Sequence, residues 1–299
     1  MTGKLTISID LELAWGFWDI LTPEILRMAE TRERPICDKL LELFDRHHIP
    51  ATWAVVAAVL DRASAQGRAG NAASWYAPEI IDRIRAAKTA HEIGSHGGRH
   101  VYYDRMSAAE AEADLAFVNQ VHRDNGLALD SFVFPRNAVG HLDLLARAGL
   151  RTFRGPDAGW VRIAPKLGSR AGKIVTFADK ILPLPPTPAP ARAQKNGSLV
   201  DIPGSMALPG RNGVRRFILP QVSRAKLAMG LAWARRSGQT FHFWFHPSNF
   251  YYRQDEQFAT LDWFLARAAN EASRGCIEIC TMGSYASRGD KAGATRAAA

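Results

Sequence analysis

The chain has only three cysteines among its 299 residues, Cys37, Cys276 and Cys280. Three thiols give no framework of the kind that staples small secreted domains. No apolar run reaches the roughly 18–20 residues that a membrane-spanning helix needs. The sequence also lacks the charged start, apolar core and cleavage site of a signal peptide, and it opens at once on residues typical of a strand. These absences exclude a disulfide-stapled module and predict a protein that stays in the cytoplasm.

Acidic residues are fewer than basic ones. The 29 Asp and Glu residues stand against 38 Lys and Arg residues, which gives a net charge of +9. Basic residues gather at 215–216, 224–226, 235–236 and 288–296. The sequence lacks the interleaving of basic and aromatic residues that is typical of nucleic-acid-binding modules, so we expect no nucleic-acid partner. Two interpretations of the basic residues stay open: a solvated face, or peripheral contact with phosphates and anionic lipid headgroups.

Length and composition suit one domain. A chain of 299 residues with 47% hydrophobic residues can bury a large core, and α/β barrels of this size often form a single domain. Strand-like runs begin at Leu5 and recur at 51–60, 93–95, 132–134, 199–202, 241–245 and 277–280. Helical stretches between them cover 31–47, 107–125, 142–148, 224–237 and 255–274. This alternation predicts a parallel barrel over residues 1–286, followed by a basic, flexible tail at residues 287–299.

The first predicted strand ends in two acids. The alternation of β-branched and small residues from Leu5 onward indicates a buried strand. Asp10 and Glu12 are two residues apart, so they share one face of an extended chain. Ligands collect at the carboxyl ends of parallel strands, which indicates a functional role for both acids. A solvated strand end, with the acids pointing into water, is the alternative.

His96 and His100 stand four residues apart. On one helical turn their Cβ atoms would lie roughly 5–6 Å apart. Two ring nitrogens, each about 2.0–2.1 Å from a metal ion, fit that separation. The pair alone is a weak signal, because nine histidines produce such spacings by chance. With Glu12 as a third ligand, the pair predicts a site for one divalent ion.

Two later apolar runs also end in polar residues. Residues 131–140 place Pro135 and Arg136 after a short apolar run. Residues 241–249 read as a buried aromatic strand that ends at His246, because Pro247 cannot donate to the next ladder bond. His246 is therefore expected on the rim of the sheet, where it could act as a general acid. A hydrogen-bonded core histidine is the alternative.

Taken in order, these four segments resemble the NodB-like polysaccharide deacetylases, which use a divalent metal to remove N-acyl or O-acyl groups from sugars. In that family a first strand ends in a base and a metal-binding acid, and a His-x-x-x-His pair follows. An Arg/Pro/Gly segment comes next, and a late strand ends in a catalytic histidine. The resemblance covers most of the chain and implies an incomplete (β/α)7 barrel. It also implies the following roles: Asp10 as base, Glu12, His96 and His100 as metal ligands, Arg136 as the partner that orients Asp10, and His246 as acid.

The chain departs from the family pattern in three places. Asp10 and Glu12 are separated by one residue, whereas many members carry adjacent aspartates. This arrangement resembles the branch in which the first acid is the base and the second the ligand, and the reverse assignment stays open. Gly97 stands where the family commonly has Ser or Thr, so a hydroxyl contact is absent. Arg136 follows Pro135, whereas the family usually places Arg before its prolines.

Further residues bear on the cofactor and the substrate. One carboxylate with two imidazoles favours zinc, with cobalt, nickel or manganese as alternatives. Residues 182–192 are proline-dense and predict an extended excursion that borders the active-site mouth or meets a membrane. The apolar helix expected at 225–234 is predicted to pack on the barrel rather than to lie on a membrane. The candidate substrate-contacting residues are Trp15, Asp157, Trp160 and Asn249, with a surface turn as the alternative for Asp157 and Trp160.

The sequence therefore predicts a metal-dependent deacetylase, an amide hydrolase that acts on an N-acylated sugar in the synthesis of a surface polysaccharide such as O-antigen. We expect the sugar to be carried on a nucleotide or a lipid phosphate and to be met in the cytoplasm, at the inner face of the membrane. Two alternatives remain. One is a hydrolase of a non-sugar amide, as in the allantoinase-like relatives of this fold, and the other is a catalytically inactive barrel that binds glycan.

Overall fold

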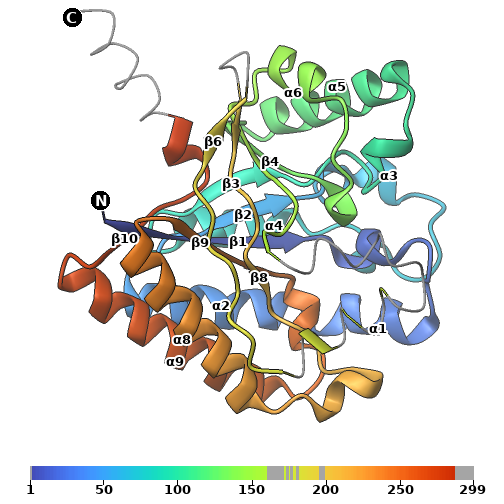
Figure 1. The fold of residues 1–299 in the computed structure, drawn as a ribbon. Helices are drawn as coiled ribbons and strands as arrows, with labels where there is room; N and C mark the ends of the chain where they lie inside the picture. The colour runs from blue at the N-terminus through green and yellow to red at the C-terminus, as the bar shows by residue number, and fades with distance from the viewer. Residues whose placement is uncertain are drawn as a thin grey trace, which may run out of the picture.

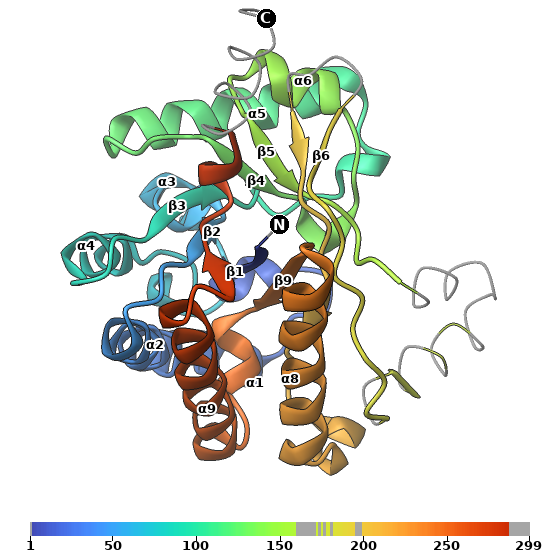
Figure 2. The ribbon, with the colours of Figure 1, turned by 60° about the vertical axis from the view of Figure 1, so that its left-hand side comes forward.

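The computed structural model describes residues 2–286, apart from residues 160–171, 173–174, 176–177, 180–181 and 195–198. The predicted tail at residues 287–299 lies outside this part of the chain. Ten strands of the described part form one sheet. Figure 2 shows that the sheet curls around a centre and that the helices lie on its outside. The architecture is that of an α/β barrel.

The described α-helices and strands alternate along most of the chain (Figure 1). The strands are β1 (Gly3–Leu11), β2 (Thr52–Val55), β3 (Glu92–Ser95), β4 (Ser131–Val133), β5 (Thr152–Arg154), β6 (Arg192–Ala193), β7 (Val200–Asp201), β8 (Met206–Ala207), β9 (Thr240–Phe245) and β10 (Ile277–Ile279). The α-helices are α1 (Pro23–Thr31), α2 (Glu33–His47), α3 (Arg62–Ala65), α4 (Pro78–Ala86), α5 (Ala108–Asp124), α6 (Leu142–Arg147), α8 (Pro220–Ser237) and α9 (Gln254–Ser273). The strand order is β6-β7-β5-β4-β3-β2-β1-β9-β8, with β10 beside β1.

One segment, residues 199–207, closes the barrel. Its first part, β7, pairs in parallel with β5, where Val200 faces Thr152. Its second part, β8, pairs in parallel with β9, where Met206 faces Phe243. The segment therefore joins the two ends of the curled sheet. With β1 to β5 and β9 it makes seven parallel positions around the barrel in the described part of the chain, and β10 pairs in parallel with β1 as a further short strand. This arrangement agrees with the predicted NodB-like barrel.

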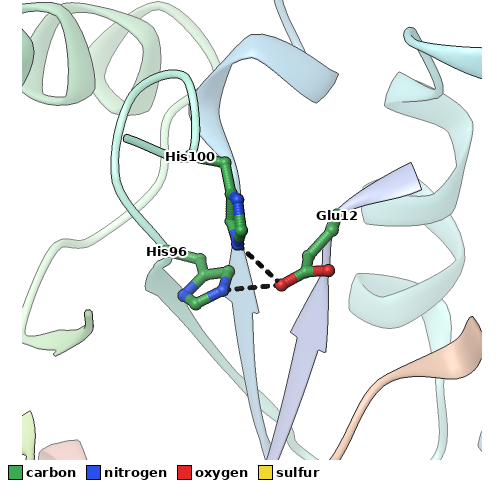
Figure 3. A group of neighbouring side chains, drawn as sticks. All are labelled: Glu12, His96 and His100. Carbon is green, nitrogen blue, oxygen red and sulfur yellow. Dashed lines mark hydrogen bonds and ion pairs between the residues drawn. The ribbon is translucent and has the colours of Figure 1, made fainter. Parts of the chain in front are cut away.

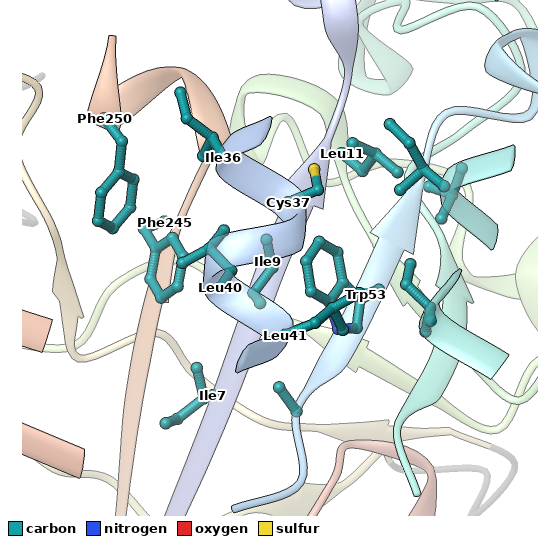
Figure 4. Packing of buried hydrophobic residues seen from close by; sticks show 14 of the residues in the cluster. Ile7, Ile9, Leu11, Ile36, Cys37, Leu40, Leu41, Trp53, Phe245 and Phe250 are labelled. Carbon is teal, nitrogen blue, oxygen red and sulfur yellow. The ribbon is translucent and has the colours of Figure 1, made fainter. Parts of the chain in front are cut away.

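The outer face of β1 packs against helices. Ile7, Ile9 and Leu11 are fully buried, and Figure 4 shows them facing Ile36 and Leu40 of α2. Successive side chains of a strand point to opposite faces, so these odd-numbered residues all point outward. Each fully buried aliphatic side chain of this kind stabilises the fold by roughly 1.5–3 kcal/mol. This packing fixes β1 and so the position of the acids at its end.

The inner face of β1 is polar and forms a directed hydrogen-bond relay inside the barrel. His242 Nδ1 lies 3.2 Å from the carbonyl oxygen of Ile202, which can only accept, so Nδ1 carries the proton. The Ser8 hydroxyl then donates to His242 Nε2 at 2.9 Å, and its oxygen accepts from Arg154 at 3.0 Å. Burial lowers the pKa of His242 to about 3, which keeps the ring neutral. The relay leads directly to Asp10, the next inward-facing residue of β1.

Helix α8 packs on the barrel, as predicted for residues 225–234. Its residues Leu227, Leu231 and Ala234 are buried in the main hydrophobic core. A Cβ atom at Gly230 would lie 2.5 Å from the Phe241 ring, so glycine permits the close approach of the helix to β9. In the part of the chain that the structure describes, no helix combines the length and the apolar character needed to cross a bilayer.

Several predicted boundaries were wrong. The run at residues 51–60 is a strand only as far as Val55, and a 3-10 turn at Ala57–Val59 follows. Both pieces are buried and apolar, and a short apolar run does not distinguish a strand from a buried turn. The helix predicted from residue 31 begins at Glu33, because α1 occupies the residues up to Thr31. Helices α1, α3 and α4 and strands β5, β6 and β8 were not predicted.

Candidate active site

Three buried side chains meet at the carboxyl ends of β1 and β3. The Nε2 atoms of His96 and His100 each lie 2.9 Å from Oε1 of Glu12 (Figure 3). Both histidines are 1% exposed and Glu12 is 6% exposed. The three groups come from two separate segments and turn their donor atoms toward one point. Such convergence of a carboxylate and two imidazoles is typical of a divalent metal site.

The protonation of these residues fits a metal ion. His96 Nδ1 lies 2.8 Å from the carbonyl oxygen of Val133, so Nδ1 carries a proton, and in the neutral ring that binds metals Nε2 faces Glu12 with a lone pair. Two acceptors then face each other, an arrangement that a cation between them would stabilise. Neither ring nitrogen of His100 makes a well-formed hydrogen bond to the described residues. A buried nitrogen without such a bond is costly, and a metal ion would give it a partner.

Electrostatics keep the ligands in their metal-binding forms. Burial alone would raise the pKa of Glu12, but the charge of His246 holds it well below its usual value. Burial lowers the pKa of His100, which leaves the ring neutral. Metal ligation requires an ionised carboxylate and neutral imidazoles. The residues present therefore fit a divalent ion.

His96 and His100 lie on a turn after β3 and not on a helix, so the expectation of a single helical turn was wrong. Gly97 (φ 77°) and His100 (φ 57°) adopt left-handed conformations that bend the chain back. The N–H of Gly98 donates to Asp114 at 2.8 Å and pins the bend. The four-residue spacing thus brings the rings together through a tight turn, a route that periodicity alone does not reveal.

Asp10 is held by Arg154. Nη1 and Nη2 of Arg154 donate to the two carboxylate oxygens of Asp10 at 2.8 and 2.7 Å, and Nη2 also reaches Asn137 at 3.2 Å. Burial alone would raise the pKa of Asp10, but Arg154 and His96 hold it below its usual value. Asp10 is therefore ionised and fixed in direction, with both of its oxygens engaged by the guanidinium group.

The prediction that Arg136 orients Asp10 was wrong. Nη2 of Arg136 donates to the carbonyl oxygen of Gly16 at 2.9 Å and to Asp19 at 2.7 Å. Arg136 has a left-handed backbone (φ 56°) and lines the cavity above the acids without contacting Asp10. Arg154 takes the orienting position. It is the last residue of β5, so the strand-end rule that singled out Asp10 would have found it if β5 had been recognised.

His246 follows β9 directly. Together with Asp10, Glu12, His96 and His100 it forms the cluster at the candidate site. Its Nε2 lies 3.3 Å from Oε1 of Glu12 and 3.6 Å from Oδ2 of Asp10. Its backbone N–H donates to the side-chain oxygen of Asn249 at 2.8 Å. Burial alone would lower the pKa of His246, but Glu12 and Asp10 raise it to about 9. His246 is therefore protonated at neutral pH and has a proton to donate.

The four candidate substrate-contacting residues have different positions. Asn249 lines the cavity above the acids, and Asp157 lines a neighbouring cavity, where it accepts a hydrogen bond from Trp244 at 2.9 Å. Trp15 belongs to the core, so its expected place in the pocket was wrong: Nε1 donates to the Trp75 carbonyl oxygen, because the 3-10 turn after Glu12 folds the ring inward. Trp160 lies outside the described residues.

A cavity of about 350 Å³ opens over the cluster. Its lining residues include Asp10, Glu12, His96, Arg154 and His246. A second cavity of about 260 Å³ shares Asn137 and Trp244 with the first, so the two are neighbours. An elongated substrate could extend from one into the other.

Backbone strain is concentrated at this site. Among the described residues, seven that are not glycine have positive φ angles. Four of them contact the cluster, follow one of its members or line its cavity: Leu13, His100, Arg136 and Asn137. Such conformations cost on the order of 1–3 kcal/mol each and persist where the surrounding structure enforces them. Their gathering at one place supports a functional site.

Residues 28–137 match the family model described as polysaccharide deacetylase. The matched segment contains His96 and His100 and ends at Asn137. No curated protein matches the chain significantly. This segment is thus similar to the polysaccharide deacetylases, as its motifs predicted, and the match supports a deacetylase that acts on carbohydrate.

Solved structures share the fold over nearly the whole chain. A Mycobacterium smegmatis protein described as a polysaccharide deacetylase has a TM-score of 0.69 at 16% identity, covering 97% of this chain and 92% of that one. PuuE allantoinase has a TM-score of 0.65 at 15% identity, with coverages of 95% and 88%. A Pseudomonas aeruginosa PAO1 protein, also described as a polysaccharide deacetylase, has a TM-score of 0.62 at 16% identity, with coverages of 95% and 90%. These likenesses confirm the predicted NodB-like barrel.

Proposed function

We propose that this protein is a metal-dependent amide hydrolase that removes the acyl group, preferably acetyl, from an N-acylated sugar. The observation that carries the proposal is the convergence of Glu12, His96 and His100 on one point beside the ionised Asp10. These three residues would hold one divalent ion. Zinc suits the donor set best, with cobalt, nickel or manganese as alternatives.

Asp10 is the proposed base. When bound, the ion would lower the pKa of a water molecule and polarise the acyl oxygen. Asp10 accepts the proton of the attacking water, because it is ionised and aimed by Arg154. Both of its oxygens are engaged by Arg154, whereas the carboxylate of Glu12 faces only imidazoles. This difference favours Asp10 as base and Glu12 as ligand over the reverse assignment.

His246 is the proposed acid. An amide nitrogen is a poor leaving group until it is protonated. His246 carries a proton at neutral pH, and its ring is 25% exposed on the cavity side. The side-chain oxygen of Asn249 accepts a hydrogen bond from the backbone N–H of His246, which fixes the backbone from which the ring extends. Asp10 and His246 would therefore handle the two protons of the reaction from the ends of two neighbouring strands, β1 and β9.

The proposed substrate is an acetylated amino sugar of a surface polysaccharide such as O-antigen, carried on a nucleotide or a lipid phosphate in the cytoplasm. Three arginines line the cavity, namely Arg136, Arg154 and Arg215, and Arg154 is already bound to Asp10. Guanidinium groups are well suited to bind phosphate oxygens. The net charge of +9 adds a general attraction for anionic substrates.

Acetate release from N-acetylated amino sugars tests this proposal. Activity that is abolished by a chelator and restored by zinc would support it. Hydrolysis of allantoin or a linear ureide, without activity on any acetylated sugar, would replace it with the allantoinase-like alternative. Bound zinc with neither activity would leave the inactive glycan-binding barrel.

A further inference from the structure

Exposed apolar side chains are confined to a few places on this protein. Among the described residues, the large hydrophobic side chains that are exposed fall on three short segments. We call these side chains the apolar rim: Trp18 and Ile20 before α1, Leu182 and Leu184 in the proline-dense excursion, and Val214, Phe217 and Leu219 before α8. Scattered exposed apolar residues need no explanation, but a gathered set marks an interaction surface.

All three segments border the candidate active site. Ile20 lines the cavity above the cluster, as does Arg215 from the segment before α8. Pro185 and Pro186, which follow Leu184, line the neighbouring cavity. The three segments of the apolar rim therefore border the two neighbouring cavities of the candidate site.

The segment before α8 has the character of an interfacial anchor. Val214 and Phe217 are 65% and 68% exposed in the 3-10 turn Gly213–Phe217, and the next residue, Ile218, is buried and holds the turn to the body. Arg215 and Arg216 are also exposed, and the guanidinium of Arg216 lies 4.8 Å from the centre of the Phe217 ring. No acidic residue occurs between 211 and 220. The apolar side chains of this turn are suited to contact the acyl chains of a bilayer, and its arginines are suited to bind the lipid phosphates.

We propose that the apolar rim docks on an anionic lipid surface, with the mouth of the site facing the bilayer. The charge favours lipid over a protein partner, because two exposed arginines and no acidic residue lie on this turn. A sugar carried on a lipid phosphate would then reach the cavity without leaving the membrane. This choice of substrate rests on the proposed function, whereas the docking itself does not.

The opposite end of the barrel supplies a matched control. Helix α8 runs from the rim back toward the N-terminus (Figure 1), where a Cβ atom at Gly3 would lie 2.2 Å from the carbonyl oxygen of Ala234. Arg236, just after Ala234, and Arg274, just before β10, are exposed at this far end. Reversing their charges changes the net charge as much as reversing Arg215 and Arg216, but away from the mouth.

Sedimentation with phosphatidylglycerol vesicles, at low and high salt, tests the docking. We expect wild-type protein to bind at low salt and to be released by salt, because charges at a surface are screened within a Debye length. The variants R215E/R216E and V214S/F217S should each bind at least tenfold more weakly, and R236E/R274E should bind nearly as well as wild type. Thermal unfolding of each variant checks that the fold is kept.

Either of two results overturns the docking: no binding of the wild type, or equal weakening by R236E/R274E and R215E/R216E. Acetate release from a soluble acetylated sugar, measured without vesicles, reports on the proposed function separately. V214S/F217S should keep this soluble activity while losing vesicle binding. Protein that binds vesicles through the rim but releases no acetate would refute the function and leave the docking in place.

Discussion

Arg154 donates to both carboxylate oxygens of Asp10, at 2.8 and 2.7 Å, although 144 residues separate the two in the chain. A paired, planar contact of this kind fixes the direction of the carboxylate as well as its charge. It also occupies one acceptor site on each oxygen of Asp10, whereas the carboxylate of Glu12 faces only imidazoles. The contact between Arg154 and Asp10 therefore favours Asp10 as the base and Glu12 as the metal ligand.

Replacing Arg154 with Lys should impair catalysis without removing the metal. An ammonium group is a point charge and cannot grip both oxygens in one plane. We expect turnover to fall by roughly 10²-fold, the effect of a misplaced catalytic group. The acid limb of the pH profile should move to higher pH, because the contact that lowers the pKa of Asp10 is weakened. The matched control is Arg136→Lys, and an equal movement of the acid limb in that variant would argue against Arg154 as the orienting residue.

Removing a ligand should release the metal. Glu12→Gln and His100→Ala should lose bound zinc in elemental analysis, whereas Asp10→Asn should keep it and lose turnover by roughly 10²-fold or more. Zinc at a hundred times its dissociation constant should also stabilise the wild type by about 2.7 kcal/mol against unfolding. Retention of zinc by Glu12→Gln together with its loss from Asp10→Asn would reverse the roles of the two acids.

The role of His246 can be separated from that of Asp10 by the choice of leaving group. His246→Gln should lower the hydrolysis of an N-acetyl amide by roughly 10²-fold, because the departing nitrogen needs a proton. An aryl acetate needs no such proton, so its hydrolysis should fall far less. Asp10→Asn should slow both substrates alike, since each requires an activated water. A similar loss on both substrates in His246→Gln would count against His246 as the acid.

Glu33 should make the stability of the protein depend on pH. Burial raises the pKa of this carboxyl group from 4.5 to about 7, although the Tyr251 hydroxyl donates to it. Between these values the folded protein holds a proton that the unfolded chain has lost, so stability falls as pH rises from about 4.5 to about 7. The rise in pKa corresponds to a loss of about 3 kcal/mol.

Urea unfolding at pH 5 and pH 8 measures this effect, with Glu33→Gln as the comparison. The variant cannot ionise, so its loss of stability between the two pH values should be smaller than that of the wild type. Equal losses in the two proteins would show that Glu33 titrates normally in the folded state.

The first strand and the ligand cluster were readable from sequence because their signals are local. Asp10 and Glu12 end a run whose alternation is visible over several residues, and His96 and His100 have a four-residue spacing within the segment that the family model matches. The long helices also carry local signals. Ser107 caps the start of α5 and forms a capping box with Glu110. Such local patterns can be recognised without knowledge of the fold.

The missed residues depend on contacts that are distant in sequence. Strand β5 has only the three residues Thr152–Arg154, too few to show alternation, so Arg154 carried no signal of its role. Trp15 stands close to Glu12 in sequence, but the turn between them directs its ring into the core. Arg136 was assigned from its place in a motif, and its left-handed backbone turns it to Asp19 instead.

The relay inside the barrel limits how this site can be moved or redesigned. Ser8 satisfies His242 below it and Arg154 above it, so removing its hydroxyl would disturb both the core and the grip on Asp10. If only the metal ligands, Asp10 and His246 were grafted onto another barrel, the hydrogen bonds that hold Arg154 and Asp10 in place would be missing. A working graft would also need the polar inner face of β1 and the neutral His242 that accepts the hydrogen bond of Ser8.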